Sequence, residues 1–276
     1  MAVKITILGS GSNGNSLYVE SPETRLLIDA GFSARQLRLR LGAIGSSADL
    51  LQAILLTHEH SDHVKGLAVL CSKLDLPIYC NRLTADAIEY QFGRRFNFQL
   101  FQTGAEFQIG DLTIETFPVP HDAQDPVGFL VKSVHGVLGV LTDLGHATQA
   151  VLQRVRQANV LLLEANHDTQ LLQADVKRPW SVKQRILSRH GHLSNEAAAS
   201  VAEQLVHPKL QRLYLGHLSS DCNSPELAQQ TVADRLRTMG ASHVEVLSTA
   251  QDIPSETFLL QQVARSESNA QMDLFC

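Results

Sequence analysis

The feature that most constrains how this chain can fold is a cluster of histidines and acids placed directly after a short apolar segment. Residues 53–57 read as a buried β-strand, and the run His-Glu-His-Ser-Asp-His follows at once at 58–63. Imidazoles and carboxylates at the end of a buried strand can converge on one point, and zinc, iron and manganese accept both ligand types. His58 and His60 can reach one ion, while Asp62 and His63 turn towards a second. A solvated polar loop is the alternative, but it does not explain this spacing.

Strands and helices alternate along most of the chain. Polar, glycine-containing turns separate them, and no repeat of solenoid period occurs. This pattern predicts an α/β fold of mixed sheets covered by helices, formed by one domain at 1–261 and followed by a polar tail at 262–276. The expected strands are 3–8, 17–20, 25–29, 53–57, 112–117, 128–132, 137–142, 160–164 and 213–215, and the expected helices are 33–41, 61–74, 147–157, 195–205 and 225–238.

Composition and charge limit the class of protein. Hydrophobic residues make up 44% of the 276 residues and charged residues 18%, which provides enough apolar side chain for a large core. The formal net charge of −5 argues against a protein that coats nucleic acid non-specifically. None of the four cysteines forms a C-x-x-C pair, no apolar run reaches the length of a membrane span, and the first residues do not read as a signal peptide. We therefore expect a cytoplasmic protein that does not enter a membrane.

The run at 58–63 resembles the His-x-His-x-Asp-His motif of the metallo-β-lactamase superfamily. Four further residues resemble the other motifs of that superfamily, in the same order and each at an expected strand end: Asp29, His121, Asp143 and His217. The resemblance implies an αββα sandwich, in which two mixed β-sheets are flanked by helices. It also implies that Asp29 orients the metal-binding loop.

The same resemblance implies a centre of two divalent metal ions, with Asp143 and a water or hydroxide between them. Zinc and manganese both suit this set of nitrogen and oxygen donors, and the sequence does not choose between them. Histidine at position 60 separates the chain from the oxygen-reducing di-iron branch, which has glutamate there. The implied ligands are His58, His60 and His121 for one ion and Asp62, His63 and His217 for the other.

Two further segments resemble phosphodiesterases of the ribonuclease Z type. Those enzymes pair a glutamate after a strand with a His-x-Thr ahead of a helix, and here Glu164 and the segment His192-Leu193-Ser194 match. The resemblance implies that Glu164 orients His192, that His192 protonates the leaving alcohol or stabilises charge on the phosphate, and that Asp62 aligns the nucleophile. The alternative is that Glu164 pairs locally, while Ser194 is only a helix N-cap and His192 is exposed.

The stretch 177–189 contains five cations and no acid, and it leads directly to His192. On an otherwise acidic chain it would place positive charge where a polyanion approaches, although a solvated helix face is equally expected. Trp180 within it could stack on a nucleobase or pack in a core or interface. Nearly the whole chain, from the run at 8–16 through 191–195 to His217-Leu218-Ser219, is similar to the YycJ/WalJ branch of the superfamily. The members of this branch are cytoplasmic bacterial enzymes described as metal-dependent 5′-to-3′ DNA exonucleases. It departs from that branch after His217, where Ser220-Asp221-Cys222-Asn223 stands in place of an expected Asn-Asn.

These observations predict a metal-dependent phosphodiesterase that acts on nucleic acid, with DNA as the expected substrate. The first rival is a small-ester hydrolase on the same metal site, acting on a thioester, a lactone or a cyclic phosphodiester. The second rival is a non-catalytic module that uses the metal for structure, although structural metal sites are normally closed. The sequence does not predict the oligomeric state.

Overall fold

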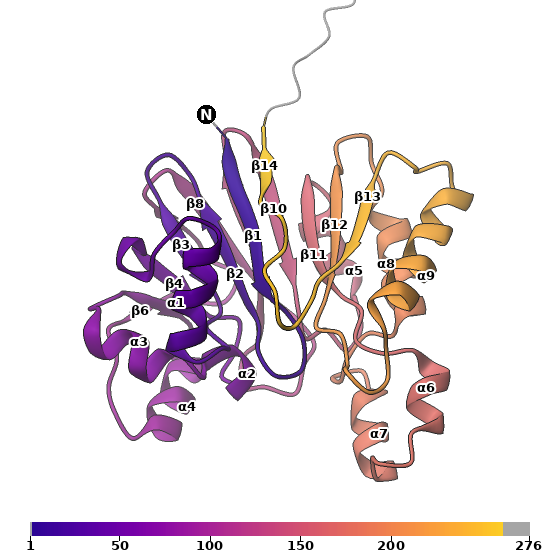
Figure 1. Ribbon diagram of the computed structural model, residues 1–276, viewed down its shortest axis with the longest axis horizontal. Helices are drawn as coiled ribbons and strands as arrows, with labels where there is room; N and C mark the ends of the chain where they lie inside the picture. Colours follow the sequence, from indigo (N-terminus) through magenta and orange to yellow (C-terminus); the bar gives the residue numbers. More distant parts are fainter. Residues whose placement is uncertain (1, 262–276) are drawn as a thin grey trace, which may run out of the picture.

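The computed structural model describes residues 2–261, and within them two seven-stranded β-sheets face each other with helices on both outer sides (Figure 1). This arrangement confirms the predicted αββα sandwich of two mixed sheets. The predicted tail at 262–276 lies outside the described residues. Among the helices of residues 2–261, none is both long and apolar enough to cross a membrane.

The first sheet has the strand order β14-β1-β2-β3-β4-β5-β6. Its β1, β2 and β3 pair antiparallel, whereas β3 to β6 pair parallel. A cluster of buried apolar side chains joins its outer face to three helices. The strands are β1 (Val3–Gly9), β2 (Ser16–Glu20), β3 (Arg25–Ile28), β4 (Ala53–Leu55), β5 (Ile78–Cys80), β6 (Phe98–Leu100) and β14 (Phe258–Leu260), and the helices are α1 (Ala34–Ala43), α3 (Leu67–Lys73) and α4 (Arg82–Phe92).

The second sheet has the order β13-β12-β11-β10-β9-β8-β7. Strands β10 to β13 pair parallel and β7 to β10 antiparallel, so β8 runs in the same direction as β10. A second apolar cluster joins its outer face to another set of helices. The strands are β7 (Glu106–Ile109), β8 (Leu112–Pro118), β9 (Val127–Ser133), β10 (Gly136–Leu141), β11 (Val160–Glu164), β12 (Arg212–Gly216) and β13 (Glu245–Ser248), and the helices are α5 (Gln149–Val155), α8 (Asn195–Leu205) and α9 (Pro225–Thr238).

The inner faces of the two sheets form a third apolar cluster, to which both sheets contribute. Ile5 and Ile28 come from the first sheet, and Phe129, Val140 and Tyr214 come from the second. All five are at most 2% exposed. Burial of this kind is the main favourable term in folding, and it holds the two sheets together face to face.

The expected helix at 61–74 is interrupted in the structure. It forms as α2 (Ser61–Val64) and α3, separated around Gly66. Ala30 makes backbone hydrogen bonds to both sides of the break. Its N–H donates to His63 O, and its carbonyl accepts from Gly66 N–H. A Cβ at Gly66 would come within 2.4 Å of Phe32 O, so the chain passes too close here for a larger residue. The break lets His63 stay at the edge of the sheets while α3 continues along the outer face.

Two short helices, α6 (Thr169–Ala174) and α7 (Trp180–Ile186), form a projection beyond the sheets, on the same side as the ends of β11 and β12 (Figure 1). Neither is long enough to show a helical period in the sequence, and they were not predicted. Strands β5, β6, β7, β13 and β14 and helix α4 were not predicted either. The remaining expected elements form within a few residues of their expected ranges.

Candidate metal centre

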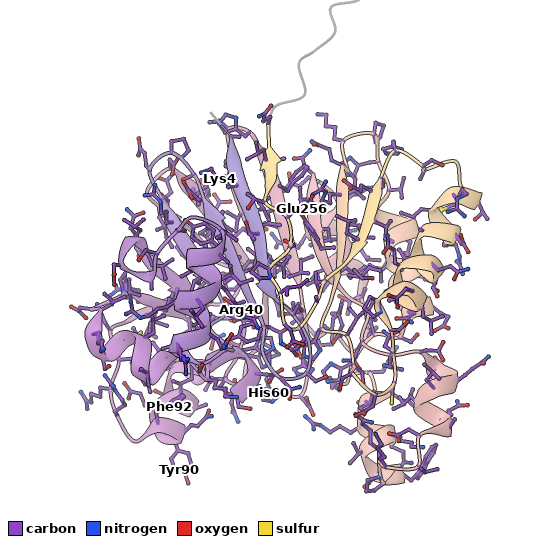
Figure 2. The ribbon with its side chains drawn as sticks, in the orientation of Figure 1. Lys4, Arg40, His60, Tyr90, Phe92 and Glu256 are labelled. Atoms are coloured by element: carbon purple, nitrogen blue, oxygen red, sulfur yellow. The ribbon has the colours of Figure 1, made fainter. Side chains whose placement is uncertain are left out.

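The candidate site lies at one edge of the sandwich, where strands of both sheets end. Strands β3 and β4 of the first sheet and β8, β10, β11 and β12 of the second all bring their carboxyl ends to it. His60 lies at this edge and Lys4 at the opposite one (Figure 2). Side chains that follow parallel strands meet at one edge of a sheet, which is the usual location of sites in α/β folds.

Three of the site residues have an unusual backbone conformation. Asp29, Asp143 and His217 have φ values of 62°, 52° and 56°, and they are the non-glycine residues with positive φ among residues 2–261. Each follows the end of a strand, so the left-handed turn redirects its side chain towards the centre. Backbone strain of about 1–3 kcal/mol per residue persists where the surrounding contacts over-determine it, and it gathers at functional sites.

The first ligand group consists of His58, His60 and His121, whose ligand atoms lie within 4.8 Å of one another. His58 Nδ1 lies 3.0 Å from Thr57 Oγ1, and His58 Nε2 is buried without a hydrogen-bond partner in the described part of the chain. His121 Nδ1 donates to Gly191 O at 3.1 Å, which leaves Nε2 facing His60 Nδ1 at 3.4 Å. Burial lowers the pKa of both His58 and His121, so both rings are neutral and present nitrogen lone pairs to the same space.

The second ligand group consists of Asp62, His63 and His217, which also meet within 4.8 Å. His63 Nδ1 donates to Asp29 Oδ2 at 2.7 Å, so its Nε2 is directed to the centre. Asp62 Oδ2 lies 3.4 Å from His63 Nε2 and 3.2 Å from His217 Nε2. This group therefore offers two nitrogens and one carboxylate oxygen.

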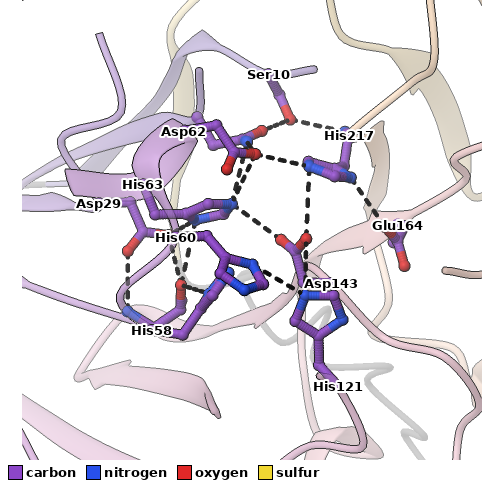
Figure 3. Close-up of polar contacts among 12 residues, drawn as sticks. Ser10, Asp29, His58, His60, Asp62, His63, His121, Asp143, Glu164 and His217 are labelled. Atoms are coloured by element: carbon purple, nitrogen blue, oxygen red, sulfur yellow. Dashed lines mark hydrogen bonds and ion pairs between the residues drawn. The ribbon is translucent and has the colours of Figure 1, made fainter. Parts of the chain in front are cut away.

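Asp143 lies between the two groups (Figure 3). Its Oδ2 is 3.0 Å from His63 Nε2, and its Oδ1 is 3.4 Å from His217 Nε2 and 3.6 Å from His121 Nε2. The side chain is almost completely buried. One carboxylate thus reaches nitrogens of both groups, as a residue shared by two ions must.

The buried carboxylates of the site need positive charge beside them, between the two ligand groups. Burial by itself would raise the pKa of Asp143, but His217 and His63 outweigh it and hold that pKa well below its usual range. Burial would lower the pKa of His63 and of His217, but the carboxylates, Asp143 first, raise both values well above the ordinary one. Buried carboxylates that hold protons on neighbouring imidazoles have the donor set that a divalent cation binds. The residues present therefore fit divalent metal ions.

Glu164 and His192 form a hydrogen-bonded pair beside the two groups. Glu164 Oε1 accepts from His192 Nδ1 at 2.7 Å and lies 2.9 Å from His217 Nδ1. Its Oε2 accepts the backbone N–H groups of Leu144 at 2.8 Å and Leu193 at 3.0 Å. Burial raises the pKa of Glu164, but His192 outweighs it, and the pKa falls to about 2. Burial lowers the pKa of His192 and Glu164 raises it, with a net increase.

Atoms of Glu164, His192, Asp143 and His217 also lie within 4.8 Å of one another, so this cluster is a further possible metal site. Its hydrogen bonds argue against that role. Both oxygens of Glu164 already accept two contacts each, and His192 directs Nδ1 to Glu164 rather than to a common centre. Glu164 therefore acts as a hydrogen-bond hub in this structure.

The helix cap at Ser194, which the alternative expected, and the contact between Glu164 and His192 are both present in the structure. Ser194 accepts the N–H of Ala197 at the start of α8. The side chain of His192 is 17% exposed and bonded to Glu164, so it is not the freely exposed residue of the alternative reading. The helix cap at Ser194 and the hydrogen bond between His192 and Glu164 are therefore compatible with each other.

The basic stretch is less positive than its sequence suggests. Lys177 and Arg178 pair with Asp221, and Arg185 pairs with Asp122. Asp221 belongs to the segment 220–223, where the chain departs from the family pattern, and this departure thus places an acid beside the basic stretch 177–189. Trp180 is 61% exposed on α7, which excludes a core position within this chain.

Several side chains that contact the site were not predicted, among them Asn166, whose Nδ2 donates to His217 O at 2.8 Å, and Ser10 and Asn15 in the loop between β1 and β2. The sequence indicated only a glycine-rich loop that tolerates positive φ and close approach of the backbone. Close approach is what the structure uses there, because a Cβ at Gly14 would come within 2.9 Å of Gly31 O, and Gly14 does not have a positive φ. The available signal was a polar residue next to such a glycine, since Ser10 lies between Gly9 and Gly11 and Asn15 follows Gly14.

Comparison with known proteins agrees with this fold and site. The model of the β-lactamase superfamily domain matches residues 24–218. The chain is 38% identical over 242 residues to Exodeoxyribonuclease YycJ of Bacillus anthracis, covering 87% of this chain and 91% of that one. It is 39% identical over 237 residues to Exodeoxyribonuclease WalJ of Streptococcus pneumoniae, covering 84% and 88%. The chain therefore belongs to the β-lactamase superfamily and, within it, to the family of the YycJ and WalJ proteins.

Solved structures show the same fold at lower identity. The metallo-β-lactamase fold protein YhfI from Bacillus subtilis superposes with a TM-score of 0.69 at 18% identity, covering 93% of this chain and all of that one. The short form of human tRNase Z superposes with a TM-score of 0.64 at 18% identity, covering 91% and 98%. At this level of identity, both comparisons show a shared fold and nothing further.

Proposed function

We propose that this protein is a metal-dependent exonuclease that hydrolyses phosphodiester bonds in DNA from the 5′ end. The observation that carries the proposal is the Glu164–His192 pair, held at 2.7 Å beside two converging ligand groups. The names of the two relatives, both exodeoxyribonucleases that align over most of the chain, support DNA as the substrate. The three free cysteines of the described chain, Cys71, Cys80 and Cys222, agree with a reducing cytoplasm.

In this proposal each of the two ligand groups binds one metal ion. When bound, two divalent ions such as zinc or manganese supply a nucleophile at neutral pH and stabilise charge on the phosphate. Asp62 stands at the second group with part of its surface open, so it can also accept a hydrogen bond from the attacking water. The proposed ligands are His58, His60 and His121 for the first ion, Asp62, His63 and His217 for the second, and Asp143 for both.

His192 is the proposed acid for the leaving group. Because its Nδ1–H is held by Glu164, its Nε2 is the nitrogen left to face the substrate. Glu164 raises the pKa of His192 against the effect of burial, which favours the protonated ring. A ring that is fixed in orientation and protonated can donate to the departing 3′ oxygen or to the phosphate.

A test compares wild-type protein with the His192→Ala variant on end-labelled single- and double-stranded DNA, after metal removal and reloading with manganese or zinc. We expect stepwise release of nucleotides from the 5′ end, lowered about 10²- to 10⁴-fold in the variant at unchanged metal content. His190→Ala is the matched control, because His190 is exposed two residues away and its side chain touches neither ligand group.

Two results would contradict the proposal. If neither metal supports DNA cleavage while a thioester, a lactone or a cyclic phosphodiester is hydrolysed, the protein is a small-ester hydrolase. If His192→Ala cleaves DNA as fast as wild type, the Glu164–His192 pair does not serve the leaving group.

A further inference from the structure

The loop between β1 and β2 contacts the site from one side only. Its residues Ser10 and Asn15 are each 3% exposed. Both side chains make hydrogen bonds within the second ligand group, and within residues 2–261 neither bonds to His58, His60 or His121 of the first group.

Asn15 connects two members of the second group. Its Nδ2 lies 3.2 Å from His63 Nε2 and 3.3 Å from Asp62 Oδ2. Its backbone N–H donates to Asp62 O at 2.8 Å. Asn15 thus touches both the backbone and the carboxylate of Asp62, and also the ring nitrogen of His63 that faces the centre.

Ser10 connects Asn15 to the third member of the group. Its Oγ accepts the backbone N–H of His217 at 2.7 Å and donates to Asn15 Oδ1 at 2.8 Å (Figure 3). The N–H of Gly11 also donates to Asn15 Oδ1, at 3.0 Å. With Oδ1 occupied by two donors, the amide orientation is determined, and its NH2 faces Asp62, His63 and the carbonyl of Gly11, which lies 3.1 Å from Nδ2.

We propose that Ser10 and Asn15 are positioning residues for the second metal ion alone. They hold Asp62 and His63 in one arrangement with His217, which lies 155 residues after Asp62 in the chain. Without them the second ligand group loses these contacts, while the first group keeps its contacts with Thr57 and Gly191. This inference rests on the ligand assignment of the proposed function.

The test measures metal content rather than catalysis. Asn15→Ala and Ser10→Ala are dialysed as full-length protein against buffered free zinc, and bound zinc per chain is determined by elemental analysis at each concentration. We expect two ions per wild-type chain and, in either variant, one ion at wild-type affinity and a second weakened about 10- to 100-fold. Retention of the first ion shows that a variant is folded at the site, and Ser10→Ala is the smaller change if Asn15→Ala does not fold.

Gln251→Ala is the matched control. Gln251 holds the same loop from outside, because its Oε1 accepts from Asn13 N and its Nε2 donates to Gly14 O, both at 2.9 Å. It does not bond to any residue of either ligand group in the described chain, so this variant should keep both ions. Asn15→Ala combined with His121→Ala, which damages the first group, should keep neither ion at wild-type affinity.

The outcomes separate the inference from the proposed function. Two ions at wild-type affinity in Asn15→Ala and Ser10→Ala would overturn the positioning role. Equal loss in Gln251→Ala would also overturn it, since loop stability alone would then explain the effect. Wild-type protein that binds fewer than two ions would instead contradict the ligand assignment itself.

Discussion

Replacing Glu164 by glutamine tests whether one buried carboxylate joins the two histidines and two loops around it. Glu164 is completely buried, and each of its oxygens has two partners. Glutamine has nearly the same shape, but it is neutral, and its amide nitrogen can only donate. It therefore cannot accept from His192, His217 and both backbone N–H groups at once.

The pKa of Glu164 sets the size of the expected effect. Burial raises this pKa, but His192 and His217 outweigh burial and lower it from the ordinary 4.5 to about 2. A difference of that size corresponds to about 3 kcal/mol in favour of the ionised, folded form. Because glutamine resembles the neutral acid, E164Q should lower the free energy of unfolding of the metal-free protein by about 3 kcal/mol at neutral pH.

The effect depends on pH in a defined direction. The pKa of Glu164 is lower in the folded protein than in the unfolded chain, so its contribution is fully present above pH 4.5 and is lost as the pH falls towards 2. At about pH 3.5 the difference between wild type and E164Q should therefore shrink to about 2 kcal/mol.

Denaturant unfolding of both proteins at the two pH values measures these differences. The control is Glu115→Gln, since Glu115 pairs with Lys132 and Arg154 away from the site. Because both partners reach solvent, this change should lower the free energy of unfolding by about 1 kcal/mol or less. Wild-type stability of E164Q, or a difference that is the same at both pH values, would refute the reasoning.

Three further predictions concern metal and DNA. Because the carboxylates outweigh burial and hold the pKa of His63 and His217 well above the ordinary value, an entering ion must displace their protons. Zinc affinity should then rise about tenfold per pH unit for each proton released. Titration calorimetry in buffers of different ionisation enthalpy measures how many protons zinc binding releases. If zinc binding releases no protons, the prediction is wrong. Asp29→Asn weakens the acceptor of His63 Nδ1 and should reduce zinc affinity about 10- to 100-fold; unchanged affinity in equilibrium dialysis would contradict this. Trp180, the single tryptophan, is exposed, so single-stranded DNA should change its fluorescence, and Trp180→Ala should weaken binding by about 1–3 kcal/mol in an anisotropy assay; equal binding would exclude stacking.

Local patterns predicted the longer elements of the fold well. Helices α8 and α9 begin and end where the sequence indicated, because serine caps at 194 and 224 precede each amphipathic segment. The apolar run of β11 was likewise sufficient to predict a buried strand. Short elements such as α6 and α7 are too brief to show a period, and the break at Gly66 depends on its contact with Ala30, which local patterns do not reveal.

Some residues of the candidate site could likewise be predicted from local sequence patterns, and others could not. His58 and His60 were recognisable because they lie two residues apart in the sequence and follow a strand. Ser10 was not, because its role depends on a contact with His217, 207 residues away. The pairing of Arg178 and Arg185 with acids outside the basic stretch was also beyond the reach of local sequence patterns, since those acids come from other loops.

Anomalous diffraction from crystals of the protein grown with manganese or zinc locates each ion among its ligands. We expect two peaks, each in contact with Asp143, while His192 contacts neither ion. A single peak, or an ion bound by Glu164 and His192, would contradict it. The expected ligands are His58, His60 and His121 for one peak and Asp62, His63 and His217 for the other.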